Sequence, residues 1–257
     1  MGRRLRRLQR LSINAAVLGE ILFCLAARAA QDGDQSRLVG DLGAGVYHTG
    51  ALVRGTADSS VLPYAYFDYG RFFARVDTFG VRTLPLGHGT LELVARVSQE
   101  GFLAQHAGVA AAQRRSNPVP VGLGSFQETP LGGFFVYGFA DLASGGALAE
   151  ATYAAEFKLA RLTVYPTAGL EWRSQRYVRH LYGIPASEAG AAAALPYAPG
   201  ASLAPNLGMA LEVPLGGSWF INGQWRRRWF DSAVSASPLV QQATQDSAFI
   251  ALSYRFK

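Results

Sequence analysis

The side chains that could do metal chemistry are few. The chain has four histidines, and all fall in predicted loops or at the ends of predicted strands: His48, His88, His106 and His180. No second histidine or carboxylate stands near any of them at the spacing of a metal-binding pair. Because zinc sites gather three or four such ligands, the sequence predicts no metal site and no cofactor.

Serine-based catalysis is not predicted either. A nucleophile and its base must lie within hydrogen-bonding reach of each other, and no predicted strand carries a His-x-Ser pair. Gly122-Leu123-Gly124 lacks the strand-then-helix setting of a phosphate-binding loop and is expected to be a turn. We therefore expect a protein that is not an enzyme, although a Ser–His pair formed only in space stays open.

Arginines are the one cluster with a chemical suggestion. They gather after one predicted strand and near the end of another, six in all: Arg173, Arg176, Arg179, Arg226, Arg227 and Arg228. Guanidinium groups bind phosphate through paired hydrogen bonds. The cluster could therefore hold a phosphate-bearing partner, or it could be a set of ordinary solvated loop charges.

The overall charge does not indicate a nucleic-acid partner. The chain has 257 residues, 24 Lys+Arg against 18 Asp+Glu, and a net charge of +6. Residues 1–29 hold six of the arginines and one glutamate, so the rest of the chain is close to neutral. Charged residues make up only 16%, below the roughly 25% of soluble domains. No apolar run past residue 30 approaches the roughly 20 residues of a spanning helix.

Residues 1–29 have the features of a secretory signal peptide. An arginine-rich start precedes a mostly apolar run, and Ala27-Arg28-Ala29 places small residues before a cut at Ala30. The only cysteine, Cys24, lies inside this segment, and the residues before it do not fit a lipoprotein anchor. We expect an exported chain, 30–257, with no disulfide. A retained amphipathic helix is the alternative.

Apolar and polar residues alternate along several segments, which is typical of half-buried strands. In 91–98, Leu91 and Leu93 share one face while Glu92 and Arg96 share the other. Similar alternation occurs in 60–69, 71–82, 161–172, 207–213 and 218–228. With weaker candidates at 38–48, 133–141, 147–157 and the C-terminus, we count ten strands.

A soluble β-sandwich also alternates, but three features favour a transmembrane barrel. The second face of several strands is polar or small, as in a lumen. Aromatic residues crowd strand ends, as at membrane interfaces, among them Trp219, Trp225 and Trp229. The last strand places four apolar or aromatic residues on one face: Ile250, Leu252, Tyr254 and Phe256. This ending resembles the signal that outer-membrane assembly machinery recognises, except that Lys257 follows the aromatic residue.

We therefore predict an all-β, antiparallel transmembrane barrel of about ten strands, with twelve as the alternative. With both termini in the periplasm, the outer loops are expected at 49–59, 84–89, 142–146, 174–205 and 231–246. The atypical long segment 101–131 then falls on the inner side, where it could hide two strands, plug the lumen or face the periplasm. This topology brings the six arginines to the outer rim, where lipopolysaccharide offers phosphates.

Several passages resemble the MipA/OmpV family of outer-membrane proteins. They are "GDLGAGVYHTG", "VLPYAYFDYGRFFARVDTFGVR", "YVRHLYGIPASEA", "SPLV" and "SAFIALSYRF", spread over about 37–257. The chain departs from the family at 122–125, where Gly-Leu-Gly-Ser replaces Gly-Leu-Gly-Asp. The resemblance implies an outer-membrane barrel, with family roles that include murein-enzyme scaffold, adhesin and small porin.

A ten-stranded barrel is close to the size whose interior side chains fill, so a wide porin is not expected. The leading hypothesis is a non-enzymatic interaction platform in the outer membrane of a Gram-negative bacterium. The resemblance points to periplasmic murein-remodelling enzymes as partners, with 101–131 as the segment to test. The expected partners also include outer-membrane lipid, lipopolysaccharide and the barrel assembly machinery. The alternatives are a narrow channel and an adhesin acting through loops 174–205 and 231–246.

Overall fold

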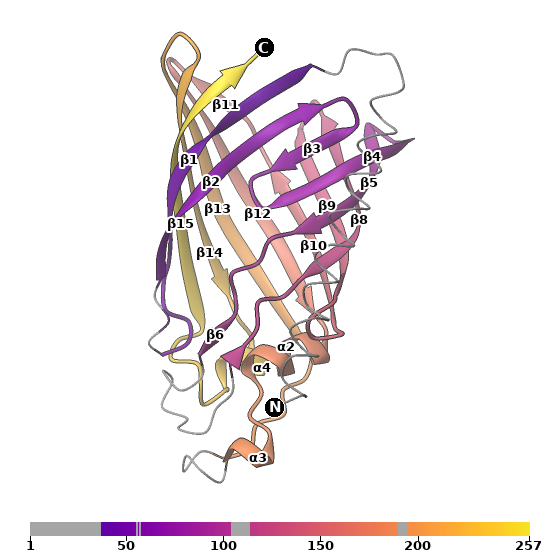
Figure 1. Cartoon of the computed structure of the whole chain (residues 1–257), viewed down its shortest axis with the longest axis vertical. Helices are drawn as coiled ribbons and strands as arrows, with labels where there is room; N and C mark the ends of the chain where they lie inside the picture. Colours follow the sequence, from indigo (N-terminus) through magenta and orange to yellow (C-terminus); the bar gives the residue numbers. More distant parts are fainter. Residues whose placement is uncertain (1–36, 55, 57, 104–113, 190–194) are drawn as a thin grey trace, which may run out of the picture.

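The computed structural model describes residues 37–54, 56, 58–103, 114–189 and 195–257. The predicted signal peptide, Cys24 and His106 lie outside the described residues. Twelve strands form the wall of a closed antiparallel barrel (Figure 1). In chain order they are β1 (Leu38–Thr49), β2 (Asp58–Tyr69), β3 (Phe72–Arg75), β4 (Thr78–Leu86), β5 (Gly89–Arg96), β8 (Pro120–Thr129), β9 (Gly132–Asp141), β10 (Ala147–Ala154), β12 (Leu162–Arg173), β13 (Ser202–Gly216), β14 (Trp219–Trp229) and β15 (Thr244–Phe256).

Each strand pairs with its neighbours around the ring, and β15 closes the ring against β1 through ten residue pairs, from Gly40–Phe256 to Thr49–Ser247. The ladder passes directly from β5 to β8 and from β10 to β12. The remaining short strands are β6 (Phe102–Leu103), β7 (Arg114–Arg115) and β11 (Phe157–Leu159). The helices are α2 (Gln175–Tyr182), α3 (Ala186–Ala189) and α4 (Ser232–Ser235). The all-β barrel is confirmed, with twelve strands rather than ten.

Two strands escaped the count from the sequence. Segment 71–82 is not one strand but the hairpin β3–β4, in which Arg75 pairs directly with Thr78. The turn between them contains Val76 at φ 62°, a conformation that β-branched residues rarely adopt. Because neither glycine nor asparagine stands at this position, the sequence does not indicate a turn there. The second missing strand is β8, which lies within 101–131.

Because the β3–β4 hairpin was not predicted, the predicted directions of the chain at β4 and β5 are reversed. The additional strand β8 means that the strands from β9 onward run in the predicted direction. The short turns that follow β2, β4, β8 and β13 lie at one end of the barrel, called the turn end, which is at the top of Figure 1, whereas the β3–β4 turn points away from it. The described parts of the other connections lie at the opposite end, called the loop end: 50–54, 97–103, 114–119, 142–146, 174–189, 195–201 and 230–243. The prediction of an outer loop at 84–89 is wrong, because these residues form a turn-end hairpin. Segment 101–131 was expected on the inner side, opposite the other long loops. Its described residues before β8, 101–103 and 114–119, lie instead at the loop end together with those loops.

The predicted faces of the strands are confirmed. On β12, Leu170 and Trp172 are exposed on the outer wall, whereas Glu171 and Arg173 between them are buried in the interior. On β5, Leu93 is exposed and Glu92 is buried. This arrangement, apolar outside and polar inside, is the reverse of a soluble barrel and suits a wall surrounded by lipid.

Candidate functional site

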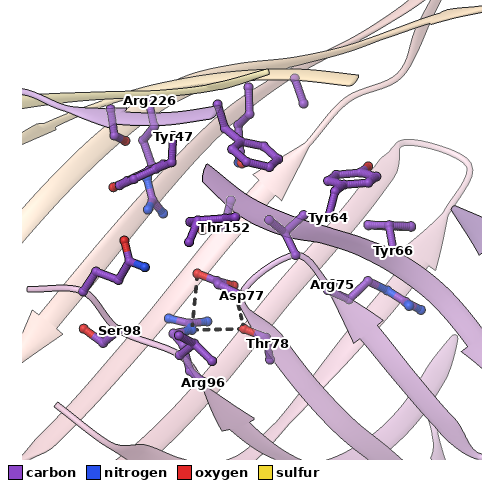
Figure 2. A pocket seen from close by; sticks show the side chains of 18 of the residues that line it. Tyr47, Tyr64, Tyr66, Arg75, Asp77, Thr78, Arg96, Ser98, Thr152 and Arg226 are labelled. Carbon is purple, nitrogen blue, oxygen red and sulfur yellow. Dashed lines mark hydrogen bonds and ion pairs between the residues drawn. The ribbon is translucent and has the colours of Figure 1, made fainter. Parts of the chain in front are cut away.

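The lumen contains a cavity of about 1450 Å³ lined by side chains from most of the strands. Its wall is rich in tyrosine, arginine and carboxylate side chains, and Figure 2 shows several of them projecting inward. The cavity extends from Glu100 and Tyr177 near the loop end to Phe256 and Lys257 at the turn end.

An apolar core closes the loop end. Residues of α2 and α4 are fully buried there, including Val178, Leu181 and Val234. They belong to one cluster with residues of the neighbouring loops: Leu52, Val53, Ile184, Phe230, Leu239 and Val240. Helix α2 begins after Ser174, whose hydroxyl accepts a hydrogen bond from the Tyr177 backbone N–H, as an N-cap residue does. The described loops therefore form a close-packed apolar core at this mouth of the barrel, and such packing excludes water.

On the lumen side of this core lies a network of polar and charged side chains, called the mouth cluster, formed by Glu100, Glu171, Arg173, Tyr177 and Arg228. Arg173 Nη2 is 2.7 Å from Glu100 Oε1, and Arg173 Nε is 2.5 Å from Glu171 Oε1. Arg228 Nη1 lies 3.0 Å from Glu100 Oε1, and the Tyr177 hydroxyl donates to Glu100 Oε2 at 2.9 Å. Both guanidinium groups are thus compensated inside the barrel.

Glu100 follows β5, and its carboxyl is strongly biased towards the charged form. Burial alone would raise the pKa of this carboxyl. The charges of Arg173 and Arg228, together with the hydrogen bond from Tyr177, outweigh the burial and lower the pKa to about 2. Burial and the nearby Glu100 charge raise the pKa of the Tyr177 hydroxyl, so this group remains a donor. At physiological pH the Glu100 carboxylate is therefore ionised and the Tyr177 hydroxyl is protonated.

Further ion pairs line the lumen between the mouth cluster and the turn end. Arg96 binds Glu150 through both guanidinium Nη atoms and contacts Thr78 Oγ1 at 3.0 Å. At the turn end, Arg255 bridges Asp41 and Glu212. A third group lies on the β2–β5 side, where Asp68 contacts Arg75 at 2.9 Å and Arg82 at 2.6 Å. Such pairing removes the cost of an uncompensated charge in a narrow interior.

A family comparison fits this architecture. The sequence model described as "MltA-interacting protein MipA" matches residues 42–256. The chain belongs to the MipA family. The match runs from within β1 to the last residue of β15, so the MipA-family region includes residues of every strand of the barrel wall.

Comparisons with other proteins add little to this family assignment. No curated protein matches the MipA-family chain. Among solved structures, the translocator domain of the autotransporter NalP from Neisseria meningitidis aligns at 14% identity with a TM-score of 0.37, covering 95% of this chain and 98% of that one. An anion-selective porin from Comamonas acidovorans aligns at 9% identity with a TM-score of 0.27, covering 85% and 98%.

The six arginines predicted to form one lipopolysaccharide contact do not lie together. Arg173 and Arg228 are buried in the mouth cluster, and Arg226 lines the lumen cavity. These three therefore cannot reach a lipid on the outer wall. The other three are exposed: Arg227 faces outward on β14 and pairs with Asp246, while Arg176 and Arg179 lie on α2. The sequence could not separate them, because their location depends on where each strand ends.

The predicted aromatic and C-terminal residues lie on the outer wall. Trp219, Trp225 and Trp229 are exposed along β14. On β15 the exposed residues are those of the predicted face: Ile250, Leu252, Tyr254 and Phe256. The ring of Tyr254 packs edge-on against both Trp219 and Phe256 at the turn end. An aromatic group at the end of the apolar band is typical of an interface girdle.

The structure also bears on chemistry that the sequence left open. Two Ser–His contacts occur, His48 Nδ1 with Ser59 Oγ at 2.8 Å and His180 Nε2 with Ser116 Oγ at 3.3 Å. Neither histidine contacts a carboxylate among the described residues, so neither pair has the third group of a catalytic triad. In the described ranges no group of three metal-ligating side chains was found. No described helix is long and apolar enough to cross a membrane.

Sequence reasoning missed the partners of the buried arginines. Glu171 lies in the segment 161–172, whose alternation was recognised, but Glu100 follows the end of β5 and received no role. Its contact with Arg228 links residues 128 positions apart in the chain, and no periodic pattern reports such a pair. The sole signal was composition, since a lumen-facing arginine in a barrel needs a carboxylate close by.

Proposed function

We propose that this MipA-family barrel is a non-enzymatic protein of the Gram-negative outer membrane that holds a periplasmic partner at its turn end. The family is named for interaction with MltA, so a murein-remodelling enzyme is the proposed partner class. The long loops of outer-membrane barrels face the outside and the short turns face the periplasm. The turn end is accordingly the surface that a periplasmic protein can reach.

The observation that carries this proposal is the difference in connection length between the two ends, because the short turns are the ones that face the periplasm. Apolar side chains are exposed at both ends, at the loop end on Leu142 and Leu195 and at the turn end on several hairpins. Leu131, in the turn between β8 and β9, is 79% exposed. Leu86, Leu159 and Leu215 are also exposed near other turn-end hairpins. Exposed apolar groups of this kind are typical of contact surfaces.

The segment chosen from the sequence as the periplasmic contact, 101–131, does not fit this role as a whole. Its described residues before β8 belong to the loop end, and only Leu131 and the adjoining end of β8 reach the turn end. We therefore place the platform on the ring of short turns. A channel is less well supported, because the apolar core closes one mouth of the lumen.

Site-specific photocrosslinking in intact cells tests the platform. A photoreactive phenylalanine analogue replaces Leu131 at the turn end, and Leu195 at the loop end is the matched control because it is also 79% exposed. We expect mass spectrometry to find a periplasmic murein enzyme crosslinked through position 131 and not through position 195. Crosslinks to external ligands through 195 alone would favour the adhesin alternative and overturn the platform.

We also propose a reduced lipopolysaccharide contact. It rests on Arg227, which lies between the exposed Trp225 and Trp229, and on the exposed α2 residues Arg176 and Arg179. Charges at the interface escape most of the cost of the membrane midplane. Replacing all three with glutamine should lower the lipopolysaccharide that copurifies with the barrel. Arg161→Gln, an exposed change at the turn end, is the control, and equal retention in both variants would remove the contact.

A further inference from the structure

One arginine of the lumen differs from the others that line the cavity. Arg75, Arg96, Arg228 and Arg255 each form an ion pair with a carboxylate. Arg226 forms no ion pair and no hydrogen bond with any side chain or backbone group in the described part of the chain. Its Nε atom is buried and unpartnered. An uncompensated guanidinium in such a place is costly unless something else binds it.

The wall around Arg226 leaves room for a ligand. Arg226 extends from β14 into the cavity, and Tyr47 projects into the same space (Figure 2). Its cross-strand neighbours are Gly208 on β13 and Ser247 on β15, both short. A Cβ atom added at Gly208 would lie 2.8 Å from Thr167 Oγ1 and 3.5 Å from Arg226 Cα. Only a glycine therefore fits at position 208, and its cross-strand partners on either side are Thr167 and Arg226, which both line the cavity.

The carboxylates of the surrounding wall are already engaged. Glu171 is held by Arg173 at 2.5 Å. Asp77 accepts a hydrogen bond from Thr78 Oγ1 at 2.9 Å and lies 3.9 Å from Arg96 Nε (Figure 2). Glu150 is bound by Arg96. The positive charge of Arg226 is thus left for a group that comes from outside the protein.

We propose that the lumen is a binding site for a small organic oxyanion, with Arg226 as the group that binds its carboxylate or phosphate. A guanidinium fork matches both anions, and the hydroxyls of Thr167 and Tyr47 line the same cavity as further hydrogen-bonding groups. The tyrosine rings that line it offer flat faces for the rest of the molecule. Because the apolar core occupies the loop end, we expect the ligand to enter from the turn end. This site does not depend on the platform proposed above.

Calorimetric titration of the full-length, detergent-folded barrel tests the site with three probes of similar size: phenyl phosphate, benzoate and neutral benzyl alcohol. We expect saturable binding of phenyl phosphate, benzoate or both. Arg226→Gln should weaken that binding about tenfold or more, the loss expected for a hydrogen-bonded charge pair. Arg161→Gln, which changes an exposed arginine that does not line the cavity, should bind as the wild type does. The two anions show which oxyanion the site prefers.

Three results would overturn the proposal: no saturable binding of either anion, equal binding by Arg226→Gln and the wild type, or equally tight binding of benzyl alcohol. Arg226→Lys provides a second variant should the glutamine protein not fold. It keeps the charge but loses the fork, so we expect an affinity between those of the wild type and a protein without the charge. Wild-type affinity in Arg226→Lys would show that the fork geometry does not bind the anion.

Discussion

Glu100 Oε1 lies 2.7 Å from Arg173 Nη2, although Glu100 follows β5 and Arg173 ends β12, four places away around the ring. The same oxygen lies 3.0 Å from Arg228 on β14, which stands directly across the twelve-stranded ring from β5. The chain that leaves β5 therefore crosses the barrel and ties opposite walls together. The crossing lies next to the apolar core of the loop end. The carboxylate of Glu100 therefore connects two strands of the barrel wall beside that core.

Replacing Glu100 with glutamine should destabilise the barrel. The change leaves Arg173 and Arg228, with side chains 1% and 8% exposed, sharing only Glu171. Removing one partner of a buried charge network is expected to lower the free energy of unfolding by about 2 kcal/mol or more. Urea titration of the detergent-folded protein, followed by the electrophoretic shift between folded and unfolded barrel, measures this difference.

Glu156→Gln is the control for this loss. Glu156 pairs with Lys158 at 3.4 Å, but both side chains are largely exposed, and exposed pairs contribute about 0–1 kcal/mol. We expect its unfolding midpoint to stay close to that of the wild type. Equal midpoints for Glu100→Gln and Glu156→Gln would contradict the role of the mouth cluster.

The contribution of Glu100 should disappear in acid. Its pKa is lowered from 4.5 to about 2, so the carboxylate is more easily charged in the folded barrel than in the unfolded chain. Its stabilisation is complete above pH 4.5 and is lost as the pH falls towards 2. The difference in unfolding free energy between wild type and Glu100→Gln should therefore shrink across that range. A difference that stays constant down to pH 2 would show that the charge of Glu100 does not stabilise the fold.

The faces of the strands could be predicted from the sequence, but the strand count and the closure of the barrel could not. Alternation along 91–98 and 161–172 identified the lumen side correctly, because one face meets lipid and the other meets charged partners. The β3–β4 hairpin was missed because its turn places Val76 at a positive φ, against the preference of its side chain. Without that turn, Phe72 to Arg82 looks like one strand.

The contacts of the lumen were even less accessible. Three consecutive arginines lie in three different places. Arg226 lines the lumen cavity, Arg227 lies on the outer wall and Arg228 belongs to the mouth cluster. Alternation places Arg226 and Arg228 on the same face, but it does not show which of them meets a carboxylate. That depends on Glu100, whose location is set by the path of the chain across the barrel.

The apolar core at the loop end predicts a barrel that conducts few ions. Leu181 of α2 is fully buried in the apolar core, and truncation of a buried leucine costs about 2–5 kcal/mol. Wild-type protein in a planar bilayer should show little conductance, whereas Leu181→Ala should show frequent openings because its core is loosened. Leu195→Ala, which changes an exposed loop residue, should behave as the wild type does. Steady, well-defined openings of the wild type would favour the channel alternative.

The end of β15 predicts how the barrel assembles. Phe256 is the last residue of the outward aromatic group and packs against Tyr254 at 5.1 Å between ring centroids. If the assembly machinery recognises this aromatic face, Phe256→Ala should lower the fraction of heat-modifiable, folded barrel in the membrane of growing cells. Lys257→Gln, which changes the exposed residue after Phe256 and keeps the aromatic face, should leave that fraction unchanged. Refolding of both variants in detergent separates assembly from stability: a Phe256→Ala protein that folds poorly there as well has lost packing rather than a recognition signal.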